Sequence, residues 1–222
     1  MAMGVESRTF QMSEELFYRD TLLLKYDIKY PQFYSDTFPV GCINQRYAAK
    51  ATAYAQHCRV TLFNQAKEQY EEGLQIDAPV RVFEAVQVYT ITLNQDCTLS
   101  LYFDRYEYTG GAHGNTVRSS DTWDVSACTR IRLNALCALP ARCRDYIMDE
   151  VNRQIEVQIA QGDYYFDDHR RNVAMYFSPQ SFYLVPEGMK VYYQLYELVP
   201  YSSGIPEYLI PYSAMIQKPS CN

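Results

Sequence analysis

The segment YEYTGGAHGNT, residues 106–116, contains His113, one of three histidines in the sequence and a candidate general base. A histidine base needs an orienting carboxylate and a nucleophile within hydrogen-bond reach. Asp104, Glu107 and Asp121 are near in sequence, but nothing in the sequence sets their geometry. Catalysis through His113, in the manner of a hydrolase, is therefore the weakest interpretation of this segment.

The glycines of the same segment offer a second kind of chemistry, phosphate binding. A glycine-rich phosphate loop needs a helix directly after it, whose amide groups point at the ligand. The residues that follow, NTVRSSDTWDV, alternate like a strand instead. Glycine also permits positive φ and close approach of the main chain. Gly110, Gly111 and Gly114 therefore predict a structural turn after Tyr108, in which His113 bonds the backbone; the rim of a binding site is the alternative.

The loop GDYYFDDHRRN, residues 162–172, is a candidate binding site of another kind. Exposed aromatic side chains supply contact area at low entropy cost, and carboxylates steer a cationic partner. The simpler alternative is that the aromatic rings cover the core while the acids face water. A metal held by His169 and its acidic neighbours is less favoured than a solvated turn. The candidate binding residues are Tyr164, Tyr165, Phe166, Asp167 and Asp168.

A tyrosine-dense stretch near the C-terminus, YYQLYELVPYSSGIPEY, presents a similar choice. Strand alternation would turn Val191, Tyr193 and Leu195 to one side and the residues between them to the other. One set belongs in the core, and the other forms either a cross-strand aromatic ladder or a binding face. A serine nucleophile has no support, because the sequence lacks GxSxG.

Composition limits the class of partner. The net charge is −6 and the pI is about 5.1, which disfavours nucleic acid, because phosphate contacts need a positive patch. Twenty-two tyrosines against one tryptophan favour antiparallel sheet and a surface suited to binding. No apolar run is long enough to span a membrane, and the first ten residues lack a signal-peptide pattern. The sequence leaves open both an intracellular protein and one that has lost a leader.

The seven cysteines are odd in number and include no CxxC pair. Neither a closed disulfide set nor a zinc site is indicated. Cys137 and Cys143 flank Pro140, but no histidine lies near to complete a metal site. We expect the cysteines to be mostly small core residues, left free as in a reducing compartment, and no metal or cofactor to be bound.

The hydrophobic period changes along the chain in a way that predicts strands and helices. Residues 25–30 alternate like a strand that ends at Pro31, and a helical stripe extends from Cys42 to Tyr70. Strands follow over 80–109, with a hairpin turn at NQDC, and again in NTVRSSDTWDV and RIRL. A second helix occupies the block from 133 to Gly162, with Ile147, Val151, Ile155 and Ile159 four residues apart. A hairpin across PEG and a short strand complete the chain.

This order, strands with one helix and then strands with one helix again, predicts an α+β fold. We expect antiparallel sheets that are each covered by a helix, in two similar halves packed into one compact unit. The N-terminal half would span 8–108 and the C-terminal half 109–216, with the boundary near Thr109.

The run Tyr108–His113 and a C-terminal signature together resemble a bacterial domain family of unknown function. The family forms the extracellular part of sigma-V-type anti-sigma factors, which are lysozyme receptors, and similar non-catalytic domains precede the catalytic domain of some peptidoglycan deacetylases. The resemblance covers 109–216, and 8–108 looks like the domain that usually comes before it. Its C-terminal residues are Phe182, Gly188, Tyr192 or Tyr193, Tyr196, Pro200, Tyr201, Gly204, Ile210 and Pro211.

The resemblance implies a non-catalytic module in the cell envelope that binds a protein, such as lysozyme, or a cell-wall glycan. Two features depart from the family: the cysteine content and the missing leader or anchor. An intracellular regulatory or structural protein of the same fold is therefore the alternative.

Overall fold

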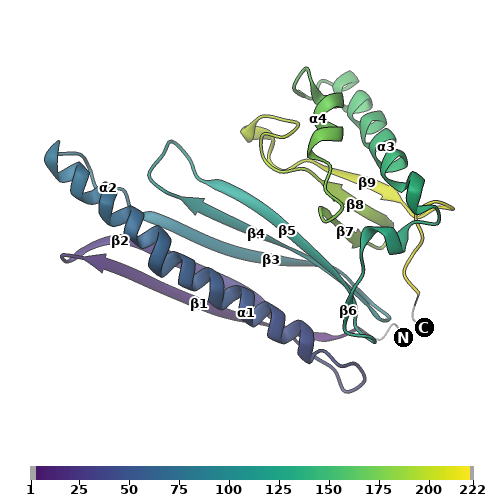
Figure 1. Cartoon of the computed structure of the whole chain (residues 1–222), viewed down its shortest axis with the longest axis horizontal. Coiled ribbons are helices and arrows are strands. Elements are labelled where there is room, and N and C mark those ends of the chain that lie inside the picture. Colours follow the sequence, from purple (N-terminus) through teal and green to yellow (C-terminus); the bar gives the residue numbers. More distant parts are fainter. Residues whose placement is uncertain (1–3, 221–222) are drawn as a thin grey trace. The chain divides into compact units, whose positions relative to one another are not determined.

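The computed structural model describes residues 4–220 and confirms the α+β class (Figure 1). A six-stranded sheet has the order β1-β2-β3-β4-β5-β6, and a second sheet has the order β7-β8-β9. The chain divides into two compact units. Within the described residues, unit 1 comprises 4, 90–102 and 118–220, and unit 2 comprises 5–89 and 103–117. The division between them cuts β3 (Phe83–Gln95), β4 (Thr98–Tyr108) and β5 (Asn115–Asp124).

Unit 2 begins with a long hairpin, β1 (Glu6–Tyr18) and β2 (Thr21–Tyr34), followed by one continuous helical rod (Figure 1). The rod consists of α1 (Gly41–His57), a π-helical turn (Cys58–Leu62) and α2 (Phe63–Gln75). Because this rod links β2 to β3, the two strands run parallel, with Leu24 opposite Phe83. The expectation of purely antiparallel sheets missed this one pair.

The helical stripe predicted from the sequence forms the core of unit 2. Its residues recur at about four-residue intervals, slightly more than the 3.6 residues of an ordinary helical turn. In a regular α-helix the stripe would therefore drift slowly around the helix. The wider π turn absorbs that drift and keeps the stripe on the sheet, where the ring of Tyr47 packs against that of Phe33 in β2. The buried members are Ile43, Tyr47, Ala51, Tyr54, Ala55, Cys58, Leu62 and Ala66.

The end of β2 differs from the prediction. Pro31 does not terminate the strand, which continues to Tyr34, with Pro31 opposite Thr9 of β1. The parallel register with β3 extends only from Leu24 to Ile28, so the proline lies beyond that ladder. A missing N–H costs little at such a position.

Unit 1 places α3 (Pro140–Ala160) and α4 (His169–Tyr176) beside the sheet of β7 (Phe182–Val185), β8 (Gly188–Tyr192) and β9 (Glu207–Pro211), as Figure 1 shows. The predicted apolar spacing of α3 is confirmed for Ile147, Val151 and Ile155, which are fully buried. Ile159 lies in the last turn and is more than one-third exposed. The hairpin across PEG and the final strand are confirmed.

Two strand predictions in unit 1 are wrong. Only Thr129–Arg130 of the RIRL region forms a strand, β6, and Leu133–Leu136 forms a 3-10 helix instead. The alternation expected over 191–196 ends with β8 at Tyr192, because the chain turns there. As a result Tyr192 and Tyr193, adjacent in sequence, are both buried, while Tyr196 has positive φ and is exposed.

The cysteine prediction is also wrong. Cys137 and Cys143 form a disulfide across the start of α3, with their Cα atoms 5.9 Å apart. Cys42, Cys97 and Cys128 are disulfide-bonded as well. Cys58 is free and buried, and burial raises the pKa of its thiol to about 12. Cys221 lies outside the described residues. The fold brings these cysteines together, and their spacing in the sequence does not reveal which of them are paired.

Within residues 4–220, the helices are too short or too polar for one of them to cross a membrane. A division of the sequence near Thr109 stays a prediction, since the spatial units follow other limits and are not contiguous in sequence.

Candidate binding site

The glycine segment of unit 2 is a bend between β4, which ends at Tyr108, and β5. Gly110 has φ of +89°, in the left-handed region that favours glycine. A Cβ atom at Gly110 would lie 2.6 Å from Oε1 of Gln69, and the Gly110 carbonyl accepts a hydrogen bond from Arg81. The bend is thus held against α2 and the segment that precedes β3.

The remaining residues of the bend contact one another. A Cβ atom at Gly114 would lie 2.3 Å from the ring of Tyr106, so the main chain rests directly on that ring. His113 is exposed, and its Nδ1 lies 2.9 Å from the Gly114 carbonyl oxygen. A Cβ atom at Gly111 would meet the His113 carbonyl oxygen at 3.8 Å, an ordinary van der Waals contact. These contacts support the turn interpretation, which we retain as a proposal.

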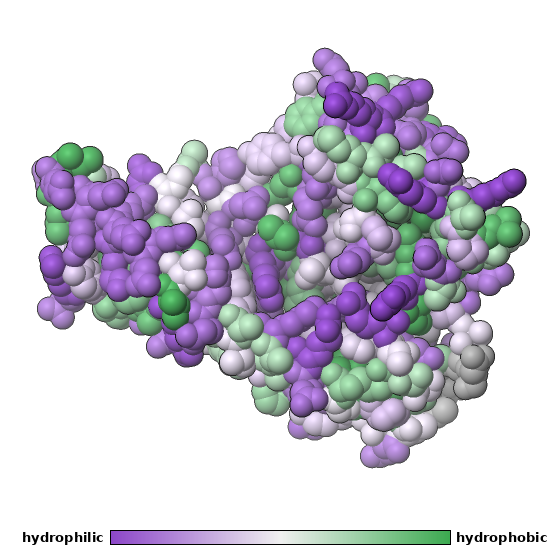
Figure 2. All heavy atoms as spheres, viewed as in Figure 1, coloured by the Kyte–Doolittle hydropathy of each residue, from purple (hydrophilic) through white to green (hydrophobic). Residues whose placement is uncertain are grey.

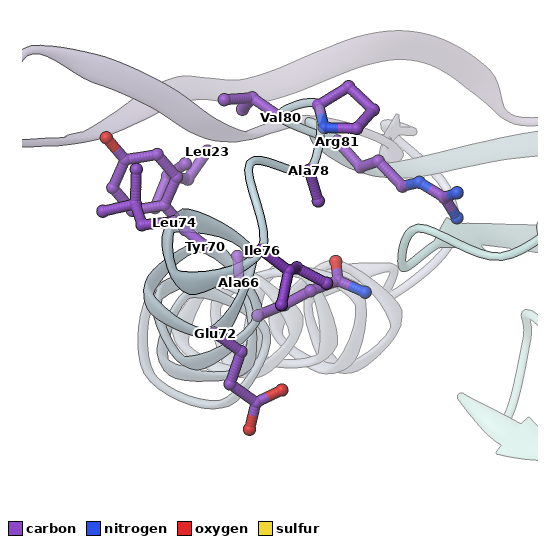
Figure 3. A pocket seen from close by; sticks show the side chains of 12 residues that line it. Leu23, Ala66, Tyr70, Glu72, Leu74, Ile76, Ala78, Val80 and Arg81 are labelled. Atoms are coloured by element: carbon purple, nitrogen blue, oxygen red, sulfur yellow. The ribbon is translucent and has the colours of Figure 1, made fainter.

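A hollow of about 250 Å³ lies beside this bend, and Gln69 and Arg81 belong to both features. Figure 3 shows that its lining is mainly apolar, with Leu23, Leu74 and Val80 around it and the carboxylate of Glu72 pointing away. Figure 2 shows hydrophobic residues exposed among hydrophilic ones where α2 ends. No sequence pattern indicates this hollow, because α2, the following loop and β2 meet only in the fold.

The aromatic loop of unit 1 divides its five predicted residues between core and surface. Tyr165 is only 9% exposed, and its hydroxyl accepts a hydrogen bond from Tyr208 at 3.1 Å and donates one to Gln158. Burial raises the pKa of the Tyr165 hydroxyl. Tyr164, its neighbour, is 65% exposed. The alternative in which the rings cover the core therefore applies to Tyr165, whereas Tyr164 is exposed to solvent.

The exposed ring of Tyr164 is in contact with the ring of Phe166. Phe166, half-buried, meets it edge-on, with ring centroids 6.4 Å apart and planes 88° apart. The backbone N–H of Phe166 bonds the carbonyl of Leu198, which fastens the loop to the segment after β8. The loop is therefore held to the rest of unit 1 at Phe166, and Tyr164 extends from it into solvent.

A hollow of about 350 Å³ lies next to Tyr164. Its polar lining comes from three separate parts of unit 1: α3, the loop itself and the segment that leads into β9. Hydrogen-bonding groups beside an exposed aromatic ring are suited to a ligand with both hydroxyl groups and apolar faces. The polar residues are Gln158, Asp163, Ser203 and Glu207.

The acids of the loop are exposed. Asp167 and Asp168 precede α4, and the carbonyl of Asp168 accepts a hydrogen bond from the Asn172 amide. Arg170, two residues after Asp168, donates a hydrogen bond at 2.9 Å to Glu156 of α3. Hydrogen bonds from Arg170 and His169 lower the pKa of Glu156. His169 is thus engaged with a carboxylate of α3.

Glu207 connects this hollow to a charged cluster inside unit 1. Arg118 pairs with one carboxylate oxygen of Glu207, and Lys190 donates to the other at 3.0 Å. The Arg118 guanidinium, only 10% exposed, lies 3.9 Å from the ring centre of Tyr102. Burial alone would raise the pKa of Glu207, and the hydrogen bond and charge of Lys190, together with Arg118, bring it below its ordinary value. Glu207 is therefore a fixed negative charge at the edge of the hollow.

Sequence reasoning missed Gln158, Ser203 and Glu207, which are far from the loop along the chain. The tyrosine-dense stretch 192–208 contains Ser203 and Glu207 and was weighed as a binding face, but on the basis of its tyrosines and not of these two residues. Among residues 4–220, His, Cys, Asp and Glu side chains do not gather in threes suited to a metal ion.

Comparison with known families supports the resemblance drawn from the sequence. Residues 18–116 match the family model described as Deacetylase PdaC, and residues 140–213 match the one described as a protein of unknown function, DUF3298. The chain is thus similar to the first family over most of its N-terminal half and to the second over most of its C-terminal half. No curated protein matches the chain.

Solved structures confirm the fold over almost the whole length. A DUF3298 family member from Bacteroides fragilis superposes with a TM-score of 0.67 at 18% identity, covering 98% of this chain and 96% of the other. A DUF3298 family protein from Pseudomonas aeruginosa gives a TM-score of 0.62 at 16% identity, covering 96% and 95%. At these identities the likeness shows the architecture alone.

Proposed function

We propose that the chain is a non-catalytic binding module that recognises a cell-wall glycan through Tyr164 and the hollow beside it. The proposal rests mainly on one observation: Tyr164 is exposed, contacts Phe166 and lines a hollow with polar residues. A sugar ring presents an apolar face for the tyrosine and hydroxyl groups for Gln158 and the carboxylates. The similarity to the families described as DUF3298 and Deacetylase PdaC is compatible with such a module.

A cationic protein such as lysozyme is the second candidate ligand. The observation that favours it is the exposure of Asp167 and Asp168 beside the same tyrosine. Exposed carboxylates accelerate encounter with a positively charged partner, and the effect weakens with salt. Glycan binding through stacking and hydrogen bonds depends little on ionic strength, so salt distinguishes the two ligands.

The disulfides favour a location outside the cytoplasm over the intracellular alternative. Disulfide bonds persist in oxidising compartments and are rare in the cytosol. Cys137–Cys143 lies at the start of α3, and three further cysteines are also paired. Fractionation of the host cell with thiol labelling tests this point; a reduced cytoplasmic pool would favour the regulatory alternative.

Hydrolysis through His113 is the least supported function. The imidazole is exposed on a bend and its Nδ1 faces a backbone carbonyl. A hydrolase screen that finds activity in the wild type and none in His113→Ala would establish the enzyme and reject the module.

Retention on insoluble peptidoglycan and on immobilised lysozyme tests the binding proposal. Tyr164→Ala should remove retention, while Phe17→Ala, which truncates an exposed ring in unit 2, should keep it. Tyr165→Ala is unsuited as a probe, because that ring is buried. Equal retention of the wild type and Tyr164→Ala would reject the site, and no retention on either material would reject both ligands.

A further inference from the structure

Strand β1 (Glu6–Tyr18) forms one edge of the six-stranded sheet, with β2 on its inner side. It is 13 residues long, against about five or six for a typical strand, and its residues are mostly exposed. Proteins usually protect such an edge with proline, bulges, short strands or charged side chains, and of these devices β1 has charged side chains, of both signs. β1 contains no proline, and its one irregularity, at Leu16/Phe17, lies at the hairpin end. A long regular ladder of backbone groups is thus open to another strand.

The side chains on one face of β1 follow a self-complementary order. Arg8, Phe10, Met12 and Glu14 alternate with the residues of the other face, and stand opposite residues 32, 30, 28 and 26 of β2. The two apolar residues are flanked by one cation and one anion. Phe10 packs on Tyr30, with ring centroids 6.0 Å apart, yet remains 44% exposed. An apolar centre with opposite charges at its ends can match a copy of itself in the reverse direction.

We propose that β1 of a second copy of this chain adds antiparallel to β1, about a two-fold axis that passes between the two Gln11 residues. In this register Arg8 lies opposite Glu14 of the second copy, and Phe10 lies opposite Met12. The symmetry repeats both pairs, giving two ion pairs around four apolar side chains. Directly opposite residues of this kind are the stabilising unit of antiparallel sheets.

Neighbouring registers are less favourable. An axis through Phe10 would place Glu6 opposite Glu14, which are like charges. An axis through Met12 would place Phe10 opposite Glu14. On the other face, the Gln11 register sets Ser7 opposite Glu15 and Thr9 opposite Ser13, so that no like charges meet.

Both charged groups are placed to pair. The guanidinium of Arg8 stacks on Tyr34, 4.8 Å from the ring centre, which holds it beside the edge. Glu14 accepts from Arg59 at 2.6 Å and from Tyr26 at 2.7 Å, and both bonds reach Oε2. The second carboxylate oxygen, Oε1, is thereby left to accept from Arg8 of the other copy. The hydrogen bond from Arg59 also lowers the pKa of Glu14 and so keeps it ionised.

Cysteine cross-linking of the whole chain tests both the dimer and its register. The variant Gln11→Cys should form a disulfide-linked dimer under mild oxidation, because directly opposite Cα atoms lie about 4.5–5.5 Å apart. Thr9→Cys alone should not, because its two copies would be four residues apart, about 13 Å. Mixing Thr9→Cys with Ser13→Cys should restore the cross-link. Gln11, Thr9 and Ser13 are all exposed, so the variants are expected to fold.

Sedimentation equilibrium gives the strength of the dimer. Arg8→Glu should weaken it about tenfold, since two ion pairs are replaced by like charges. Arg171→Glu, the same charge reversal on α4, should leave it unchanged. A wild-type monomer at all concentrations, or equal cross-linking of Gln11→Cys and Thr9→Cys, would overturn the proposal. A monomer that instead binds an extended peptide with the β1 sequence would assign the edge to a peptide ligand and overturn the dimer as well.

Discussion

The bend at 109–114 in unit 2 and the loop at 162–168 in unit 1 both attract attention in the sequence, and the fold uses them differently. In the bend, Gly110 is enclosed by Gln69 and Arg81, and Gly114 rests on a tyrosine ring. In the loop, Tyr165 is held in the core while Tyr164 is supported at the surface. Main chain constrained by its neighbours indicates a structural role. An exposed side chain on a loop that is held to its unit is what the binding proposal requires.

The largest expected effect separates the two tyrosines of the loop. Tyr165→Ala should lower the free energy of unfolding by about 3 kcal/mol, because it leaves a cavity under α3. Tyr164→Ala should change it by less than about 0.5 kcal/mol. Chemical denaturation of both variants measures the difference, and equal losses would remove the division between core and surface.

The next effect concerns the bend. Gly110→Ala should cost about 2 kcal/mol, because a left-handed residue would gain a Cβ atom against Gln69. Gly111→Ala, one residue later, is the matched control and should cost less than about 0.5 kcal/mol, because its Cβ atom would make only an ordinary contact at 3.8 Å. If both substitutions are tolerated equally in thermal unfolding, the glycine pair does not serve the backbone.

A smaller effect tests the hydroxyl that anchors the loop. Tyr165→Phe keeps the ring but removes the hydroxyl that joins Gln158 and Tyr208. The loss should be about 1 kcal/mol, the usual net value of a buried hydrogen bond. Denaturation with Tyr164→Phe as the control measures it, and identical stabilities would show that the hydroxyl network contributes nothing to holding the loop.

The smallest effect should come from His113. His113→Ala removes an exposed side chain whose Nδ1 faces the carbonyl of the next residue, so stability should change by less than about 0.5 kcal/mol. Binding should be unaffected, since the bend carries no ligand in this account. Lost retention on peptidoglycan in this variant, with its fold intact, would transfer the site from the loop to the bend.

Periodicity predicted those parts of the fold that depend on local pattern. The stripe from Ile43 to Ala66 mixes three- and four-residue intervals, which fit a helix and not a strand, and the apolar residues of α3 recur over a block too long for an ordinary strand. Pro31 misled because the cost of a proline depends on whether a neighbouring strand needs its N–H. The disulfides could not be read from spacing, since their cysteines are brought together by the fold.

The candidate site was predictable only in part. The sequence drew attention to the loop but could not tell Tyr164 from Tyr165, because adjacent loop residues carry no period that assigns a face. Gln158 and Glu207 join them only when α3 and β9 flank the same hollow. Composition could thus identify the loop, but it could not identify which of its side chains are exposed.

Hydrogen exchange during titration with soluble peptidoglycan fragments tests the contrast between the two regions most directly. The account predicts new protection at 162–168 and in the residues from Ser203 to Glu207, with exchange at 109–114 unchanged. Protection confined to 109–114, or a ligand that binds without protecting the loop, would contradict it.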